Sequence, residues 1–524
     1  MAGLATKVKC FSYQIFLYVF NLRGNCRTSG EQRRKESGNV FGEGSRTPIS
    51  ITILVRKPKK DPDELAAILY KDIGDYLTRE DKLKTIKDFG SMLSASIGLS
   101  SIAPNQAGDW INQRDGLFET FIGLAPEKKY DIKSSTVFVI NSRGLETSRD
   151  SIVYSSCLSD ITNNVRDMIS RYNKQREEFH LVENNVKDLL SFIHDEDARI
   201  IWTRGTRRNC ANNVIYSFDE SNIRTGIYRP FFKQHVYVSA QANEYVNHWL
   251  RFFPTPQSKN LVICVSGANI RRPFSCLITD VIPDLHIFDE GTQCFPLYWY
   301  EKNECDQLSL FDSGKDEYKR HSGLSNFIVQ RAREEYGPKV TAEDVFYYVY
   351  GFLHSQEYRQ RFANNLKKGL ARIHLAATTQ DFKTFVKAGR KLADLHLNYE
   401  SIEPHPSVII ENDSDAPTVQ QMRFGKSNGE EDKSIIHFND SIRIINIPLR
   451  AYDWQVNGKS PIEWIMERYA VTVNRDSQIR NDPNDWCREH GQPRYILDLI
   501  GRIVNVSIQT LDLMASLPPL SFKT

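Results

Sequence analysis

Short apolar segments, broken by Pro, Gly and Asn, fill residues 228–305 and constrain the fold more than any other feature of the sequence. They are rich in β-branched and aromatic residues, and each is too short for a long helix. The segments are "YRPFFKQHVYVS", "NLVICVSGANIRRPFSCLITD" and "CFPLYWYE". They predict a β-rich module. Because helical spacing replaces this pattern farther along the chain, we expect a mixed α+β fold.

Helices are expected on the C-terminal side of this module. Thr341 is placed to cap "AEDVFYYVYGFL", and Ser355 to cap a second helix that ends near Gly369, so that the two form a helical hairpin. Residues 416–458 then predict a polar loop and strands, with Asn457-Gly458 as a hairpin turn. A last helix over about residues 493–517 has apolar residues at helical spacing: Ile496, Ile500, Ile503, Val506, Leu511 and Met514.

The first 227 residues predict an α/β region. Its clearest strand is "SRTPISITILVRKPKK" (45–60), whose alternating Ile and Val residues indicate one buried face. A capping box from Thr78 to Asp81 is expected to open a helix. The other expected elements are a strand in "FSYQIFLYVF", a long mobile connection over 21–45, helix throughout 63–94, two strands around Gly144 within 130–155, and a helix over 158–172.

Charge and cysteine content exclude several classes of protein. The net charge of +3 is too small to indicate nucleic-acid binding by itself, so the placement of basic residues matters more. Nine cysteines without a CxxC pair favour neither a disulfide framework nor a zinc ribbon, which indicates a reducing, cytoplasmic location. No apolar run reaches the ~18 residues of a membrane helix, and we expect no membrane partner.

A search for catalytic motifs gives no catalytic or metal-binding residue. The sequence has no GxSxG elbow, HExxH helix, GKT phosphate loop or GxGxxG turn between strand and helix. "IPDLHIFDEG" has a nuclease-like Pro-Asp opening, but no lysine follows Asp289 and Glu290 at the required spacing. His354 is expected to be a hydrogen-bonding residue at a helix boundary rather than a base.

Basic residues interleaved with polar hydrogen-bonding residues are the candidate DNA contacts. Such side chains suit phosphates as charge partners and base edges as bidentate donors, although each cluster alone is typical of a solvated face. The candidates in the β-rich module are Arg229, Lys233, Asn269, Arg271 and Arg272. Arg33 and Arg34, in the connection over 21–45, are expected near the DNA backbone.

Several strings together resemble the Type ISP restriction-modification enzymes. The strings "SRTPISITILVRKP", "DIGDYLTREDKL", "GDWINQRD" and "GLETSRDSIVY" resemble the end of the methyltransferase region of that family. "IRTGIYRPFFKQHVYV", "PFSCLITDVIPDLH", "CFPLYWYE", "VFYYVYGFLHSQEYRQRF" and "PRYILDLIGRIVNVSIQTL" are similar to its C-terminal specificity region. The resemblance covers nearly all of the chain after about residue 15. It departs from the family after the expected helical hairpin, where this chain has Ala371-Arg372-Ile373-His374.

The resemblance implies three regions. These are the truncated end of a methyltransferase sheet with a basic loop (1–60), a methyltransferase-associated α/β region (61–227) and a DNA target-recognition region (228–524). Family methyltransferases hold S-adenosylmethionine at a Gly-rich turn and act on a flipped adenine held by an Asn-Pro-Pro-aromatic motif. Neither is present, since "NDPNDW" (481–486) differs from that motif and lies in the specificity region. We therefore expect no cofactor in this chain.

The sequence thus predicts a module that recognises double-stranded DNA and is inactive in catalysis alone. Two other functions remain open. The chain could be the C-terminal half of a split, S-adenosylmethionine-dependent, adenine-specific methyltransferase that works with an upstream-encoded polypeptide carrying the methyltransferase, helicase or nuclease parts. It could also be a scaffold for protein partners. The opening residues, "MAGLATKVKC", match no known pattern and fit a fragment.

Overall fold

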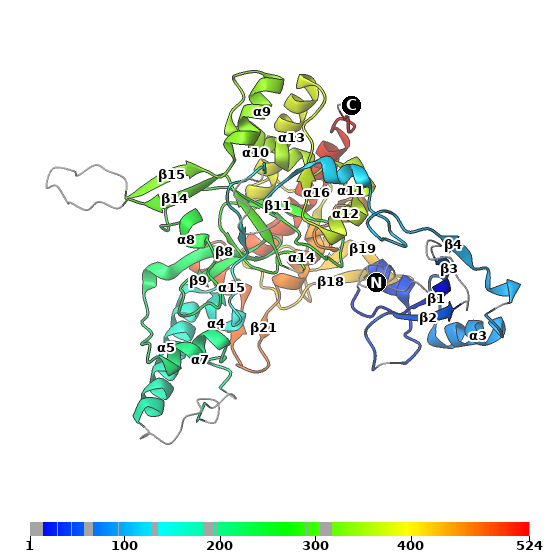
Figure 1. Cartoon of the computed structure of the whole chain (residues 1–524). Helices are drawn as coiled ribbons and strands as arrows, with labels where there is room; N and C mark the ends of the chain where they lie inside the picture. Colours follow the sequence, from blue (N-terminus) through cyan, green and yellow to red (C-terminus); the bar gives the residue numbers. More distant parts are fainter. Residues whose placement is uncertain are drawn as a thin grey trace. The chain divides into compact units, whose positions relative to one another are not determined.

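The computed structural model describes residues 14–28, 30–42, 44–56, 66–92, 94–126, 135–181, 192–193, 197–289, 291–303 and 317–522 (Figure 1). The chain divides into two compact units, one of residues 1–120 with 361–368 and one of 121–360 with 369–524. Both contain helices and strands, so the predicted α+β class is confirmed. Within the described residues, no helix is long and apolar enough to cross a bilayer. The functional division at residues 60 and 227 stays a prediction.

The first unit is built on a four-stranded sheet with the order β2-β1-β3-β4. β1 runs antiparallel to β2 and parallel to β3, and Leu17, Val19 and Ile68 form a small buried core on these strands. The predicted capping box between Thr78 and Asp81 is confirmed at the start of α3. The bounds in this unit are β1 (Gln14–Arg23), α2 (Gly30–Glu36), β2 (Ile49–Arg56), β3 (Ala67–Asp72), α3 (Arg79–Phe89), η1 (Ala95–Ile97), β4 (Ser100–Ile102), η2 (Gly116–Thr120) and α12 (Ala363–Lys368).

Three expectations in the first unit were wrong. Residues 67–72 form strand β3 rather than helix, because parallel pairing with β1 overrides the helical spacing of this short segment. The connection over 21–45 contains helix α2. Strand β2 lacks a buried face, since it lies at the edge of the sheet and leaves Ile51, Leu54 and Val55 exposed.

Two four-stranded sheets organise the N-terminal part of the second unit, with the orders β11-β10-β13-β6 and β12-β8-β9-β7. They confirm the β-rich character of residues 228–305. The bounds are β5 (Ile122–Gly123), β6 (Ser142–Arg143), β7 (Tyr154–Ser155), β8 (Ile223–Arg229), β9 (Phe232–Tyr237), β10 (Val262–Val265), β11 (Cys276–Thr279), β12 (Ile282–Pro283), β13 (Gln293–Pro296), β14 (Tyr298–Lys302), β15 (Tyr318–Ser322) and β16 (Arg372–Ile373).

Helices pack around these sheets, and α16 runs through the centre of the second unit (Figure 1). All six apolar residues predicted to share a face of the last helix are buried. The helical bounds are α4 (Asp150–Val153), α5 (Leu158–Leu181), α7 (Arg204–Ala211), η3 (Glu220–Asn222), α8 (Trp249–Phe252), α9 (Asn326–Tyr336), α10 (Ala342–Phe352), α11 (Gln356–Arg361), α13 (Thr379–Leu397), η4 (Leu449–Tyr452), α14 (Pro461–Arg468), α15 (Pro483–Glu489) and α16 (Tyr495–Ala515).

A third four-stranded sheet, β17-β20-β19-β18, and the two-stranded sheets β14-β15, β16-β5 and β21-β22 also belong to the second unit. The predicted turn at Asn457-Gly458 is confirmed, because both residues have positive φ and Val456 bridges Lys459 across them. The bounds are β17 (Ile409–Glu411), β18 (Arg423–Ser427), β19 (Glu430–His437), β20 (Arg443–Ile445), β21 (Thr472–Val473) and β22 (Arg480–Asn481).

Two further expectations were wrong in part. The strands around Gly144 do not pair with each other: Leu145 bridges Asp284 and Glu146 bridges Tyr245, so residues 135–149 form an irregular segment with the short strand β6. The helix expected from Ser355 to Gly369 is two short helices, α11 and α12, although Thr341 does cap α10. The break falls at Phe362, whose buried ring packs against Phe118.

Candidate nucleic-acid interface

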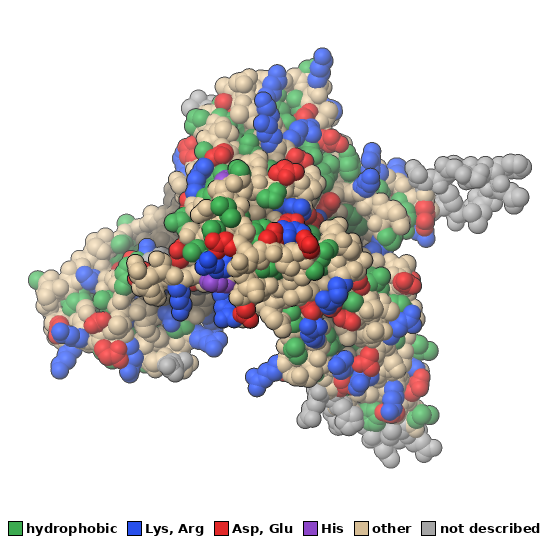
Figure 2. Space-filling view, turned by 180° about the vertical axis from the view of Figure 1, so that it is seen from behind, with side chains coloured by type: hydrophobic (Ala, Val, Ile, Leu, Met, Phe, Trp, Pro, Cys, Tyr) green, Lys and Arg blue, Asp and Glu red, His purple; other side chains and the backbone are tan. Residues whose placement is uncertain are grey.

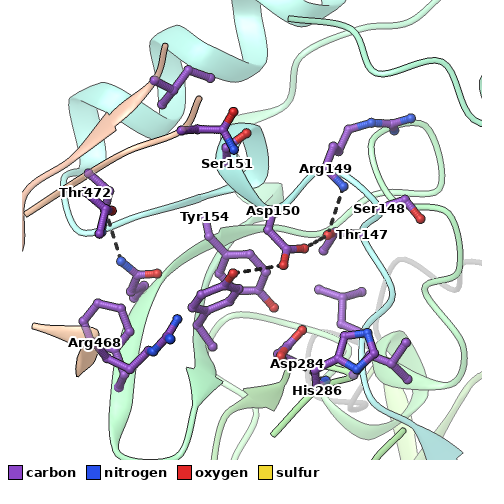
Figure 3. A pocket seen from close by; sticks show the side chains of 18 of the residues that line it. Thr147, Ser148, Arg149, Asp150, Ser151, Tyr154, Asp284, His286, Arg468 and Thr472 are labelled. Atoms are coloured by element: carbon purple, nitrogen blue, oxygen red, sulfur yellow. Dashed lines mark hydrogen bonds between the residues drawn. The ribbon is translucent and has the colours of Figure 1, made fainter. Parts of the chain in front are cut away.

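A cavity of about 620 Å³, lined by both polar and apolar side chains, lies among segments of the second unit that are far apart in the sequence (Figure 3). Residues 145–151 form one wall, β8 and β9 with Asp284 and His286 form another, and the β21–β22 hairpin contributes the rim. Gly144 allows the first wall to lie this close, because a Cβ atom on it would come within 2.4 Å of the carbonyl oxygen of Asp284. The cavity therefore depends on contacts between these distant segments.

Asp150, at the start of α4, is the centre of the first wall. Its carboxylate accepts hydrogen bonds from the Thr147 hydroxyl and, at 3.0 Å, from the Tyr228 hydroxyl of β8. The rings of Tyr228 and Tyr154 are in contact, with 4.8 Å between their centroids. Burial raises the pKa of both tyrosines, so their hydroxyls stay protonated at neutral pH. Figure 3 shows Asp150 between Thr147 and the tyrosine rings.

Arg229, one of the predicted DNA contacts, lies beside this cluster rather than on the surface. Its guanidinium forms an ion pair with Asp284, approaches Asp150 to 3.8 Å and covers the Tyr228 ring at 4.1 Å. Burial opposes the charge on Arg229, but the Asp284 carboxylate raises its pKa on balance. Burial also raises the pKa of Asp284. The positive charge of Arg229 is therefore paired with a carboxylate of the same protein. Its role in DNA contact stays a prediction.

The β21–β22 hairpin presents side chains of the kind that read DNA. Asn474, Arg475 and Gln478 are exposed in its loop. The Asn474 side-chain oxygen accepts hydrogen bonds from the backbone N–H groups of Asp476 and Ser477 at 3.1 and 2.9 Å, which holds the loop in one conformation. A two-stranded ribbon of this size fits the major groove of duplex DNA. The sequence signal for this loop is the polar string "NRDSQIR" (474–480), which was not among the predicted DNA contacts.

The other predicted contacts of the second unit lie outside the cavity. Lys233 on β9 forms an ion pair with Glu400 at 2.7 Å. Arg272 pairs with Asp289 at 2.7 Å and donates a hydrogen bond to the backbone carbonyl oxygen of Asn457. Asn269 and Arg271 are exposed on the same loop between β10 and β11. This loop therefore presents polar and basic side chains to solvent, with Arg272 fixing its position.

Arg33 and Arg34 belong to the first unit, in the last turn of α2. Arg33 donates a hydrogen bond to the carbonyl oxygen of Ser37 at 2.6 Å, and Arg34 is exposed. The structure brings these two arginines together on one short helix. Whether they contact DNA stays a prediction.

The remaining sequence candidates have structural roles where they are described. His354 is buried, and its Nδ1 lies 2.8 Å from the carbonyl oxygen of Tyr350, as expected of a residue at a helix boundary. Asp289 pairs with Arg272, while Glu290 lies outside the described residues. Over the described part of the chain, no group of three or more His, Cys, Asp and Glu side chains could hold a metal ion.

Comparison with known proteins gives one family. A model described as the Type ISP C-terminal specificity domain matches residues 136–499. A search of curated proteins gave no match. Among solved structures, a nuclease-deletion mutant of the Type ISP restriction-modification enzyme LlaGI in complex with a DNA substrate mimic is 34% identical, with a TM-score of 0.84, and the match covers 100% of this chain and 45% of that chain.

Two further solved structures are similar over the same length. The ATP-dependent Type ISP restriction-modification enzyme LlaBIII bound to DNA is 30% identical, with a TM-score of 0.84, and the match covers 100% of this chain and 32% of that chain. A DrdV–DNA complex is 25% identical, with a TM-score of 0.80, and the match covers 99% of this chain and 49% of that chain. This chain thus spans less than half the length of each of these proteins.

Proposed function

Because this chain belongs to the Type ISP restriction-modification family, with the specificity domain over residues 136–499, we propose that it recognises double-stranded DNA for an enzyme of that family. The observation that carries the proposal is the similarity over the full chain to two Type ISP enzymes whose structures contain DNA or a DNA mimic. The proposal places the protein in the cytoplasm, where such DNA is accessible.

The β21–β22 hairpin is the proposed reading element. Arg475 is exposed and has no ion-pair partner among the described residues, so its guanidinium is available for the O6 and N7 atoms of a guanine. The side-chain amides of Asn474 and Gln478 make hydrogen bonds within the loop, so their role is to hold the backbone that carries Arg475. The wall of the cavity supports the hairpin loop, since the Ser477 hydroxyl donates a hydrogen bond of 3.3 Å to the hydroxyl of Ser151, next to Asp150.

The loop between β10 and β11 is the proposed phosphate contact. Asn269 and Arg271 are exposed on it, and Arg272 ties it to Asp289. Lys233, Arg229, Arg33 and Arg34 remain weaker candidates, because Lys233 and Arg229 already pair with carboxylates and the two α2 arginines lie in the other unit. Phosphate contacts of this kind orient the duplex without reading its sequence.

Fluorescence anisotropy with a labelled duplex, measured over a range of salt concentrations, tests this function. We expect log affinity to fall with log salt by about 0.9 for each phosphate neutralised. The double variant Arg271→Ala plus Arg272→Ala should bind more weakly. Its slope of log affinity against log salt should be smaller by the contribution of about one to two phosphates. If the unaltered protein has no affinity for duplex at low salt, the proposed function is wrong.

We also infer that this chain does not hold S-adenosylmethionine by itself. The string at residues 481–486 has other roles: Asn481 accepts a hydrogen bond from the Ser156 backbone N–H at 2.9 Å, Asp482 caps α15, and the Trp486 ring stacks on His490 at 4.0 Å. These groups support the fold rather than a flipped adenine, and the inference about the cofactor rests on the sequence, which has no GxGxxG turn. Calorimetric titration with S-adenosylmethionine should give no heat of binding, and saturable micromolar binding would contradict this inference.

A second candidate function is one half of an adenine-specific DNA methyltransferase that is completed by an upstream-encoded polypeptide. The edge strand β2 favours it, because β2 pairs on one side with β1 and leaves Ile51, Leu54 and Val55 exposed. Among the described strands none pairs with the other edge of β2, and an apolar edge of this kind is a site for addition of another strand. Co-expression with the upstream product, followed by transfer of labelled methyl groups to DNA, tests it. Methyl transfer by this chain alone would contradict both candidates.

A further inference from the structure

A groove with an apolar floor and a basic rim lies between α9 and α13 of the second unit, away from the cavity described above. It encloses about 610 Å³ and includes the turn at residues 337–340 that follows α9. The stacked rings of Tyr336 and Phe382, with centroids 4.1 Å apart, form the floor together with Val340 and Val386. The Tyr336 hydroxyl already has a hydrogen-bond partner, because it donates to the carbonyl oxygen of Ala376 at 2.6 Å. The floor therefore offers ring faces and methyl groups.

The rim of this groove is positively charged. Lys383 and Lys387 are one turn apart on α13, and Lys339 faces them from the turn after α9. All three are exposed and have no ion-pair partner among the described residues. Arg390 pairs with Asp344 at 2.9 Å and covers the Tyr347 ring at 4.3 Å, so the one acidic residue of the lining is already neutralised. Figure 2 shows Lys and Arg side chains gathered at the top of the molecule, where α9 and α13 lie in Figure 1.

We propose that this groove binds an acidic, amphipathic helical segment of a partner protein. Its apolar side chains would cover the Tyr336 and Phe382 rings, and its carboxylates would meet Lys339, Lys383 and Lys387. Helix-in-groove recognition uses apolar anchors spaced i, i+3, i+4 and i+7 over a floor of this kind. Charges at the rim of such an interface raise the association rate and select partners of opposite sign.

Duplex DNA fits the groove less well than a peptide. The DNA backbone presents phosphates and sugars, and contacts to it are hydrogen bonds and ion pairs that need no apolar floor. DNA on the rim would leave the rings and valines beneath it without apolar partners. An amphipathic segment satisfies both the floor and the rim, because it carries apolar side chains on one face and carboxylates on the other.

The test uses a fluorescein-labelled peptide of about 18 residues with Leu at i, i+3, i+4 and i+7 and Glu on its other face. We expect saturable binding to the full chain in fluorescence anisotropy. The variant Lys383→Glu plus Lys387→Glu should bind about tenfold more weakly, since two partly exposed ion pairs become repulsive. Lys391→Glu is the matched control, because it lies on α13 but does not line the groove, and it should change affinity little.

A charge exchange separates groove binding from general attraction to a basic protein. A peptide with Lys in place of Glu should prefer the Lys383→Glu plus Lys387→Glu variant. Duplex affinity of this variant should stay unchanged, so that the result is independent of the proposed DNA recognition. The proposal is overturned if the double variant binds the acidic peptide as well as the unaltered protein does, or if the variant loses duplex affinity instead, which would assign the rim to DNA.

Discussion

The guanidinium of Arg229 lies against the carboxylate of Asp284 in an ion pair whose acidic partner is almost fully enclosed, with 2% of its side chain exposed. Arg229 ends β8, and Asp284 follows β12, the strand that pairs with β8 in parallel. The Asp284 carboxylate also accepts a hydrogen bond from the His286 backbone N–H at 3.0 Å. The pair therefore joins the sheet to the wall of the cavity, and Arg229 contributes to the fold before any contact with DNA.

Arg229→Ala is expected to lower the free energy of unfolding by about 3–5 kcal/mol, because it leaves the Asp284 carboxylate buried without its partner. Urea denaturation followed by circular dichroism measures this loss. The double variant Arg229→Ala plus Asp284→Ala should recover part of it, since neither charge is then isolated. A fully stable Arg229→Ala protein with weakened duplex affinity would instead support the DNA contact that the sequence suggested.

Arg475→Ala is expected to weaken binding to the recognised duplex by about 1–3 kcal/mol, the range for loss of one bidentate base contact. The salt dependence of binding should stay unchanged if Arg475 reads a base, and its slope should fall by about 1 if the arginine contacts a phosphate. Anisotropy titrations with specific and random duplexes measure both. Arg423→Ala, an exposed arginine on β18, is the control and should leave both quantities unaltered.

Much of the local structure could be predicted because it depends on local chemistry. The Thr78 capping box, the Thr341 cap and the Asn457-Gly458 turn are set by side chains within three residues of one another. The apolar face of α16 was equally clear, since 3.6-residue spacing leaves few alternatives. By contrast, residues 67–72 became strand β3 through pairing with β1, which lies more than 40 residues earlier in the sequence.

The candidate site was harder to predict for the same reason. Arg229 is predicted as a DNA contact because it is a basic residue close to Lys233 and the polar Gln234, but nothing in the sequence indicates that Asp284, 55 positions away, binds it. Asn474 and Arg475 were missed because one arginine between polar residues is an ordinary pattern for a loop. These two residues become candidates only in the folded structure, where their hairpin borders the cavity. Residues distant in the sequence form that cavity.

The first unit should lose stability in acid through Asp109. Its buried carboxylate pairs with Arg114 at 2.8 Å and with Lys368. Burial opposes the charge, but hydrogen bonds from Arg114 and Lys368 outweigh burial and lower the pKa of Asp109 below its ordinary value. Because the folded pKa lies below the unfolded pKa of about 4, the carboxylate stabilises the fold above that pH. This stabilisation is lost as the pH falls from about 4 through the folded pKa.

Asp109→Asn separates this contribution from general acid effects. The variant should be less stable at pH 7 by about 3 kcal/mol, the loss expected when a buried charge partner is removed, and its stability should change less between pH 5 and pH 2. Thermal unfolding over this pH range measures the difference. Parallel pH profiles for the two proteins would show that Asp109 does not contribute to the acid sensitivity.

The crossing of α10 and α13 should be the most sensitive helix contact to a single added methyl group. A Cβ atom on Gly389 would lie 1.9 Å from the carbonyl oxygen of Tyr347, and one on Gly351 would lie 2.4 Å from that of Phe385, so the two backbones touch at these glycines. Gly389→Ala must push the helices apart and should cost about 3 kcal/mol, at the upper end for overpacking. Gly116→Ala, whose added methyl group meets no atom within 4 Å, is the control and should change stability little.

A shift of α13 should also affect the groove, because α13 carries Lys383 and Lys387. Gly389→Ala should therefore lower the affinity for the acidic peptide, whereas Gly116→Ala should not. Equal melting temperatures for the two variants would show that the helices can separate at no cost.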